Sequence, residues 1–396
     1  MNYRFNYIIV FIAFTALVSC RKPYMPPAVT ASNNYLVVEG VINSGADSTI
    51  IKLNRTVKLS NGNTVNPELS AIVTVESDAN TSYALTETPN GTYVSPGLNL
   101  SATHKYRLRI KTSSNKEYLS DFVPVVNSPA IDNVTSKVES DGVGINLNTH
   151  DPANNTHYYR WEYEETWIFL SAFDSHFKSN GDTVLRRDLF NDHIYQCWRT
   201  TGSTTIVLGS SAKLSKDVIS NTPITFVSRH SDKLRHRYSI LVRQYALTSE
   251  GYNFWTNLKK NTEQLGSIFD AQPSQIKGNI HSTADPLEPV IGYVSIGSFS
   301  TQRIFVDEND LPAWLDPIDN GCQAKPYLYA YKDPITGGIT NQVDEYINYN
   351  KTSFSPLIPV DAIVPPGGSI VGYTAAVPEC VDCTLFGTNK QPSFWQ

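Results

Sequence analysis

Apolar and polar residues alternate with a period of two over much of the chain, the pattern of β-strands that bury one face. The clearest run covers residues 105–111, where Tyr106, Leu108 and Ile110 point to the same side. Residues 35–126 hold several such runs, separated by turn dipeptides such as Asn90-Gly91. The spacing of these short runs predicts an immunoglobulin-like β-sandwich over residues 35–126.

A second sandwich, of fibronectin-III type, is predicted for residues 127–308, beyond a proline-bearing joint. Its longest predicted strand covers residues 158–169, and the run 238–247 is the expected partner in the sheet. Strand alternation gives residues 158–169 one largely aromatic face, made of Trp161, Tyr163, Glu165, Trp167 and Phe169. The fold class is therefore mainly β, with two sandwich domains.

One helix is predicted at about residues 249–265 of the second domain. Ser249 is a suitable N-cap, and Gly266 is suited to end the helix in the left-handed conformation. An apolar stripe for packing on a sheet is formed by Tyr252, Trp255, Leu258 and Leu265. Residues 309–396 are rich in Pro, Gly, Tyr and Cys with weak periodicity, which indicates a loop-rich C-terminal extension pinned by disulfides.

The N-terminal sequence is typical of an export signal. Arg4 precedes an apolar run over residues 7–18, which is too short to span a bilayer, and the small residue Ser19 stands directly before Cys20. This arrangement resembles the lipobox of bacterial lipoproteins. We expect a signal peptide at 1–19, lipid attachment at Cys20 and a proline-bearing tether over residues 20–34 that holds the first domain at a membrane.

Composition fits an exported protein and excludes some partners. Charged residues make up 17% of the chain and aromatic residues 11%, and the formal net charge is −5. A nucleic-acid partner would call for a basic patch, so we expect none. No cofactor is expected either.

Four cysteines follow Cys20, an even number that favours two disulfides in an exported chain. They are Cys197, Cys322, Cys380 and Cys383. We favour bridges from the Cys380/Cys383 pair back to Cys322 and Cys197, which would fasten the tail to the body. A four-thiolate zinc site and a redox CxxC motif are the alternatives.

The chain holds no HExxH, GxSxG, Walker or GxGxxG signature, and we expect no catalysis. Glu162 and Glu164 share a strand face at about 7 Å, a spacing that leaves open a carboxylate-dependent hydrolase. Glu165 lies instead among aromatic residues, where a buried carboxylate needs a cationic partner. Arg243 is the expected partner in a structural ion pair, and Arg160 is the other candidate.

Two tryptophans lie in less regular segments than the rest and are candidate ligand platforms. Trp198 stands beside Cys197, and Trp314 stands between prolines and acidic residues. The remaining tryptophans that fall on regular elements, such as Trp161 and Trp255, are expected in the core.

Several segments, taken in order, resemble an uncharacterised lipoprotein family, domain-of-unknown-function family 4249 (DUF4249). They are residues 36–42, 158–161 with 165–167, 238–247, 266–270 with 272–273, 278–280, 380–383 and 392–395. The resemblance implies an exported Bacteroidetes lipoprotein encoded beside a TonB-dependent outer-membrane receptor. It implies no reaction, and no catalytic residue carries over. Arg21-Lys22 follow Cys20 where surface-exported lipoproteins of that group often carry acidic residues, which leaves the membrane face open.

We therefore expect an outer-membrane lipoprotein, held by its lipid on the periplasmic or cell-surface face. Its expected function is that of a binding or accessory component of a TonB-dependent uptake system. A structural or adhesive envelope protein is the first alternative, and a hydrolase acting on glycans or peptides is the second.

Overall fold

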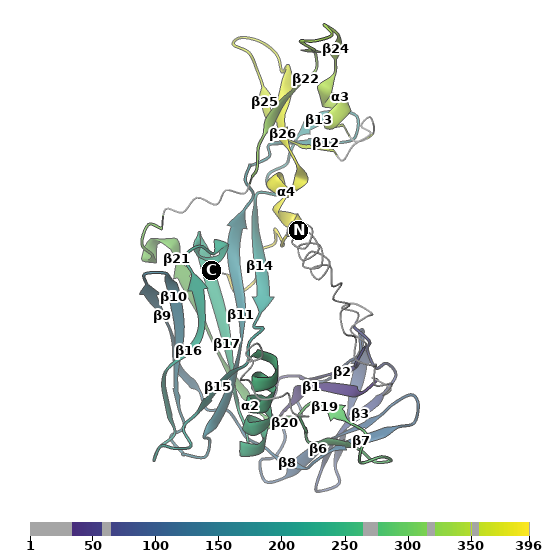
Figure 1. The fold of residues 1–396 in the computed structure, drawn as a ribbon, viewed down its shortest axis with the longest axis vertical. Helices are drawn as coiled ribbons and strands as arrows, with labels where there is room; N and C mark the ends of the chain where they lie inside the picture. Colours follow the sequence, from purple (N-terminus) through teal and green to yellow (C-terminus); the bar gives the residue numbers. More distant parts are fainter. Residues whose placement is uncertain are drawn as a thin grey trace, which may run out of the picture.

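The computed structural model describes residues 34–57, 65–263, 276–314, 321–348, 350 and 356–395. Two β-sandwich domains lie side by side, and a smaller module projects from one end of the second (Figure 1). The fold is mainly β, as the alternation predicted. The predicted signal peptide and Cys20 lie outside the described residues, as does almost all of the tether.

The first domain is one long sheet that folds back on itself at β4 (Ser82–Thr88). The start of β4 pairs with β3 (Ile72–Ser77), and its end pairs with β5 (Thr92–Ser95). Both halves of the sheet contribute to one apolar core, in which Tyr93 and Leu108 are fully buried. The remaining strands of residues 35–126 are β1 (Leu36–Asn43), β2 (Thr49–Arg55), β6 (Lys105–Lys111), β7 (Glu117–Ser120) and β8 (Val123–Pro124).

The first domain is completed by a segment that returns to it late in the chain. β18 (Ile280–Ser282) pairs with β7, while β19 (Val290–Ile291) and β20 (Ser295–Gly297) run parallel to β1. The prediction that assigned these residues to the second domain was wrong. Alternation identifies a strand, but it does not say which sheet edge the strand will cover.

Asn279 fastens this return. Its side chain is buried and exchanges two hydrogen bonds with the backbone of Val294, at 2.8 and 3.0 Å, so that it acts as one more rung of strand pairing. The preceding Gly278 has no room for a side chain, because a Cβ there would lie 1.7 Å from the carbonyl oxygen of Gly292.

The second domain packs two sheets face to face. Trp161, Tyr159 and Tyr238 are fully buried between them. One sheet holds β9 (Ile131–Glu139), β10 (Gly142–His150) and β16 (Val218–Ser228). The other holds β14 (Gln196–Gly202), β11 (Tyr158–Leu170), β17 (Arg237–Ala246) and β21 (Phe299–Asp307), and β15 (Val207–Ser210) pairs with the start of β11. The 3₁₀ turns η2 (Asp232–Leu234) and η3 (Glu308–Asp310) flank β17 and β21. This is the sandwich that the sequence predicted.

The predicted helix is present as α2 (Ser249–Glu263), which lies between the two sandwiches (Figure 1). Its N-cap is Thr248 rather than Ser249, because the Thr248 hydroxyl accepts from the backbone N–H of Gly251 at 3.1 Å. The buried side chain is Phe254, which the predicted stripe omitted and which packs on Tyr293. The predicted end at Gly266 lies outside the described residues.

The projecting module joins two stretches that are distant in sequence. A hairpin of β12 (Phe177–Ser179) and β13 (Val184–Arg186) packs on a sheet of β22 (Lys325–Leu328), β26 (Gly372–Ala376) and β25 (Ile358–Ile363). Its other elements are β23 (Tyr331–Lys332), β24 (Ile339–Thr340), α3 (Gln342–Tyr346), α4 (Pro378–Val381) and η4 (Cys383–Leu385). The predicted extension therefore carries short strands and recruits residues from within the second domain.

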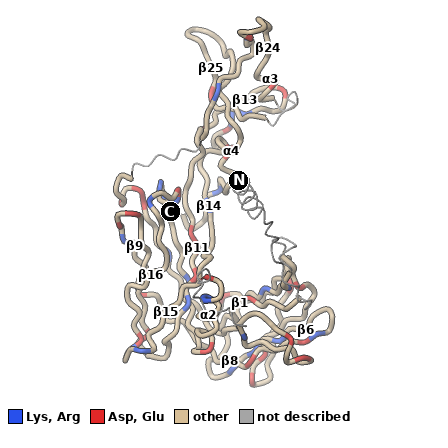
Figure 2. The backbone as a smooth tube through the Cα atoms, viewed as in Figure 1, with Lys and Arg blue, Asp and Glu red and all other residues tan. Residues whose placement is uncertain are grey.

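Charged residues of both signs are interspersed over the two sandwiches (Figure 2). None of the helices in the described ranges is long and apolar enough to cross a membrane.

Candidate functional site

A cavity of about 690 Å³ lies between the two sandwiches, beside α2. The first domain lines it with the outer face of β1 and β2. Alternation along these strands turns Val38 and Ile51 into the core and leaves Val41 and Ile50 facing the cavity. The second domain contributes side chains from β11, β17, β21 and α2. We refer to this cavity as the interdomain cleft.

A buried arginine forms part of the floor of the interdomain cleft. The Arg160 guanidinium lies 4.1 Å from the ring centroid of Trp255 and 4.7 Å from that of Tyr245. Its Nη1 donates to Glu162 at 2.6 Å, and the Tyr245 hydroxyl donates to the same carboxylate at 3.1 Å. Burial, reinforced by the charge of Glu162, raises the pKa of Tyr245 to about 12. Tyr245 therefore stays a hydrogen-bond donor at neutral pH.

Arg243 provides a second guanidinium on the same floor. It stands directly opposite Glu162 in the β11–β17 register, and its guanidinium stacks on Phe299 at 5.0 Å. Its Nε is buried without a hydrogen-bond partner. Within the described ranges, the Glu162 carboxylate is in ion-pair contact with Arg160, and no carboxylate is in such contact with Arg243. The floor thus sets two cations against one anion.

The predicted ion pair between Glu165 and Arg243 was wrong. The two side chains lie on opposite faces of the sheet. Arg243 is on the same face as Glu162, whereas Glu165 points into the core and is 5% exposed. The partner of Glu165 is Lys233 of η2, whose Nζ donates at 2.6 Å, and the Tyr238 hydroxyl adds a bond at 2.8 Å. Burial, followed by the charge of Glu165, raises the pKa of Tyr238. The inference that a buried carboxylate needs a cation held, but the identity of the cation did not.

The acidic pair considered for hydrolysis lies on the outer face of β11. Glu162 is held by Arg160 and Tyr245, and Glu164 lies 3.6 Å from the Arg303 guanidinium. Among the described residues, no three His, Cys, Asp or Glu side chains gather as they would around a metal ion.

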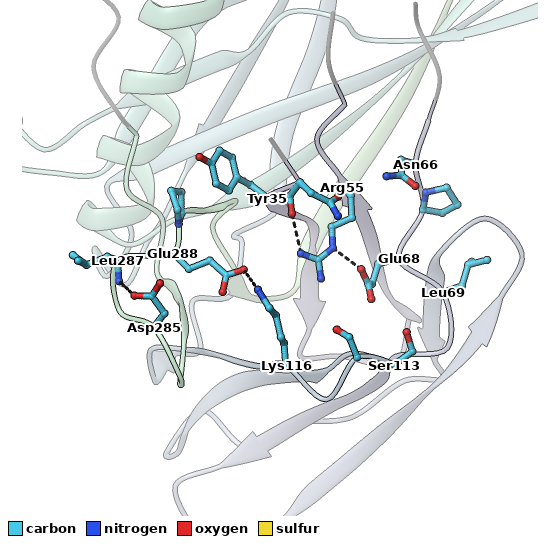
Figure 3. A pocket seen from close by; sticks show the side chains of 14 residues that line it. Tyr35, Arg55, Asn66, Glu68, Leu69, Ser113, Lys116, Asp285, Leu287 and Glu288 are labelled. Atoms are coloured by element: carbon cyan, nitrogen blue, oxygen red, sulfur yellow. Dashed lines mark hydrogen bonds and ion pairs between the residues drawn. The ribbon is translucent and has the colours of Figure 1, made fainter. Parts of the chain in front are cut away.

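A second cavity, of about 790 Å³, opens at the edge of the first domain (Figure 3). Its charged side chains satisfy one another. Arg55 donates to Glu68 at 2.5 Å, and Glu288 accepts from Lys116 at 2.9 Å and from the Tyr118 hydroxyl at 2.8 Å. Burial alone would raise the pKa of Glu288, but these two hydrogen bonds outweigh it and lower the pKa. The hydrogen bonds to Glu288 hold the returning segment against the first domain. The charged groups of this cavity are thus already paired, unlike the guanidinium of Arg243 in the interdomain cleft, which has no carboxylate partner among the described residues.

The four cysteines form two disulfides, Cys197–Cys383 and Cys322–Cys380. This confirms the favoured pairing, in which the CxxC cysteines bridge back to the body. No thiolate is left among these four residues for the zinc or redox alternatives.

The platform prediction for Trp198 was wrong, because the side chain is only 5% exposed and packs edge-on against Trp395. The C-terminal tail folds over it, with Thr388 pairing to its backbone. Trp314 is half-buried and packs against the core of the second domain, which does not suit a platform either. Trp255, for which the sequence predicts a core position, lines the interdomain cleft instead.

Several of the residues that matter here were not identified from sequence. No sequence pattern around Lys233 indicates its role, because it lies in the short turn η2 and its partner, Glu165, lies on the distant strand β11. Asn279 lies in the Gly-Asn-Ile segment 278–280 that carries part of the family resemblance, but the sequence does not predict a role for its amide.

Three comparisons relate the chain to known proteins. A family model described as "Domain of unknown function (DUF4249)" matches residues 21–303. No curated protein matches the chain. A solved structure, described as the Yersinia pseudotuberculosis adhesin InvE, is similar at 13% identity and a TM-score of 0.15 over 54% of this chain. The match spans 55% of that chain, about half its length, and a TM-score of 0.15 does not indicate a shared fold.

Proposed function

The chain belongs to the DUF4249 family, a domain of unknown function, and from this premise we propose that it is an outer-membrane lipoprotein serving a TonB-dependent receptor. In this proposal Cys20 carries the lipid, and the folded domains act as a binding or accessory subunit without catalysis. The resemblance of the N-terminus to a lipobox supports the anchor. The two disulfides support export, because such bonds persist in oxidising compartments.

The observation that carries the proposal is the form of the projecting module. It stands away from both sandwiches, with β24 and the loop between β25 and β26 at its far end (Figure 1). Ile335 is 92% exposed and Ile339 is 72% exposed, both in the β23–β24 hairpin. Exposed large apolar side chains on a projecting surface are typical of a protein-binding site. We take this tip as the surface that contacts the receptor.

Recovery of the receptor tests the proposal. The tagged full chain is extracted from membranes in mild detergent, and the proteins recovered with it are identified by mass spectrometry. We expect a TonB-dependent β-barrel receptor among them. The double variant Ile335→Lys/Ile339→Lys should recover at least about tenfold less receptor, because charged side chains would replace two apolar contacts.

Val65→Lys is the matched control, because Val65 is 74% exposed but lies on the first domain. It should recover as much receptor as the unaltered chain. Recovery of no β-barrel protein by the unaltered chain would contradict the proposal. Equal recovery by the double variant would contradict the assignment of the tip. The anchor is tested separately by Cys20→Ser, which should move the protein from the membrane fraction to the soluble fraction.

A further inference from the structure

The floor of the interdomain cleft holds two guanidinium groups and one carboxylate, which leaves one positive charge without a compensating anion. Glu162 compensates the Arg160 guanidinium at 2.6 Å, whereas Arg243 lies against an aromatic ring with no carboxylate partner among the described residues. Glu39 and Lys52 also line the cleft, as cross-strand neighbours of opposite sign that add no net charge. A partly buried cation without an anion is unfavourable, so the cleft as it stands is poised for an anion.

The geometry of Arg243 suits a carboxylate. A guanidinium presents a planar fork of donors that matches the two oxygens of a carboxylate, and the Arg243 guanidinium lies over the ring of Phe299. Arg243 also lines a smaller adjoining cavity of about 250 Å³, beside Glu164 and Ser203. One spare charge between two glutamates favours a monoanion, since a doubly charged phosphate would be repelled by Glu162 and Glu164.

The walls of the cleft suit an apolar body. Val41 and Ile50 line it from β1 and β2, Tyr293 lines it from the returning segment, and Trp255 and Leu258 line it from α2. A volume of about 690 Å³ lies within the usual range for small-molecule sites, which are lined mainly by apolar and aromatic groups with few polar anchors. A molecule with a ring or short aliphatic body and a single anionic end would satisfy both parts of the cleft.

We propose that the interdomain cleft binds an organic monocarboxylate with an apolar body, and that Arg243 is the residue that binds its carboxylate. This inference deepens the binding role put forward above and rests on it. Arg160 serves as a positioning residue, because its charge is already met by Glu162 and it holds the ring of Trp255 at the cleft.

Calorimetric titration of the full chain carrying Cys20→Ser tests the proposal. The probes are 2-naphthoate and its neutral counterpart 2-naphthylmethanol, which share one apolar body and differ in the anionic end. We expect 2-naphthoate to bind about 10- to 100-fold more tightly, the contribution of a charge-assisted hydrogen-bond pair. Arg243→Gln should remove this preference and bring the affinity for 2-naphthoate down to that for the alcohol.

Arg107→Gln is the matched control. Arg107 also stacks on an aromatic ring, that of Phe122 at 4.6 Å, but it is already paired with Glu76 and lies outside the cleft. It should keep the preference for the acid. Continued binding of 2-naphthylmethanol by Arg243→Gln shows that the variant cleft is folded, and Arg243→Lys should restore part of the preference.

Three results would overturn the proposal. They are absence of 2-naphthoate binding by the chain with Arg243 intact, equal affinity for the acid and the alcohol, and an acid preference that survives Arg243→Gln. The titration contains no receptor, so a negative result leaves the receptor proposal standing. Conversely, failure to recover a receptor leaves the titration result valid.

Discussion

Replacing Lys233 by Met isolates the cost of a carboxylate left buried without its cation. Glu165 is 5% exposed and would lose the 2.6 Å contact with the Lys233 Nζ, keeping only the Tyr238 hydroxyl at 2.8 Å. Removing one partner of a buried ion pair costs about 3–5 kcal/mol. The Lys233 side chain is 24% exposed, so water relieves part of this, and we expect a loss of about 3 kcal/mol in the free energy of unfolding.

Glu165→Gln should cost less, about 1–2 kcal/mol. The amide oxygen still accepts from Tyr238, and the ammonium of Lys233, which is partly exposed, reaches solvent. The double variant should lose less than the sum of the two single changes, because the buried charge is absent in it. Lys137→Met is the control. It breaks a surface pair with Glu139 in which Lys137 is 70% exposed, and should cost less than about 0.5 kcal/mol.

Urea unfolding followed by tryptophan fluorescence measures these differences, since Trp161 and Trp167 are buried in the same domain as the pair. The reasoning predicts an order, with Lys233→Met more destabilising than Glu165→Gln. An equal or reversed order would refute it, as would an unchanged free energy of unfolding for Lys233→Met. The first outcome would mean that water already solvates the Glu165 carboxylate in the fold.

Three further changes test other parts of the fold. Exchanging Cys322 and Cys380 for Ala opens a bridge that spans 58 residues, which should destabilise the projecting module by about 4 kcal/mol and accelerate its cleavage in limited proteolysis. Gly292→Ala sets a Cβ 2.1 Å from a carbonyl oxygen at a φ of +134°, and should cost about 2–3 kcal/mol in thermal unfolding, whereas Gly144→Ala, with 3.6 Å to its nearest neighbour, should not. Burial and Glu162 raise the pKa of Tyr245 from 10.0 to about 12, so the folded chain holds this proton more tightly than the unfolded chain. Its stabilising effect is complete below pH 10 and should fall by about 1.4 kcal/mol per unit as the pH rises from about 10 to 12; circular dichroism showing constant stability over that range would contradict this.

Much of the fold could be predicted from period-two alternation, because a strand that buries one face has apolar residues at every second position. Tyr106, Leu108 and Ile110 are all buried, as their spacing predicted. The cysteine pairing followed from export and from the position of the CxxC segment near the end of the chain.

The candidate site did not follow in the same way, because its residues meet through topology. Arg243 and Glu165 stand on neighbouring strands, and only the register shows that they point to opposite faces. Residues 280–297 have the same alternation whichever sheet they join, and only the open edges of β1 and β7 decide the matter. The sequence around Trp198 shows no clear alternation and so does not indicate that β14 buries it, while the tail that covers it lies almost two hundred residues away.

The return of the chain to the first domain also determines what kind of cleft this is. A single linker would let two sandwiches hinge, but here two connections run side by side and are bonded to each other. The backbone N–H of Val126 donates to Ile296 at 2.9 Å, and that of Ser128 donates to Ser298 at 3.2 Å. Asn127 accepts from the Ser44 hydroxyl at 2.7 Å, which ties this double connection to the first domain. With α2 as a third connection, the walls of the cleft are held in place before any ligand arrives. Because a preformed site loses little free energy to ordering its side chains and loops on binding, the interaction with Arg243 contributes almost fully to the preference for an anionic ligand.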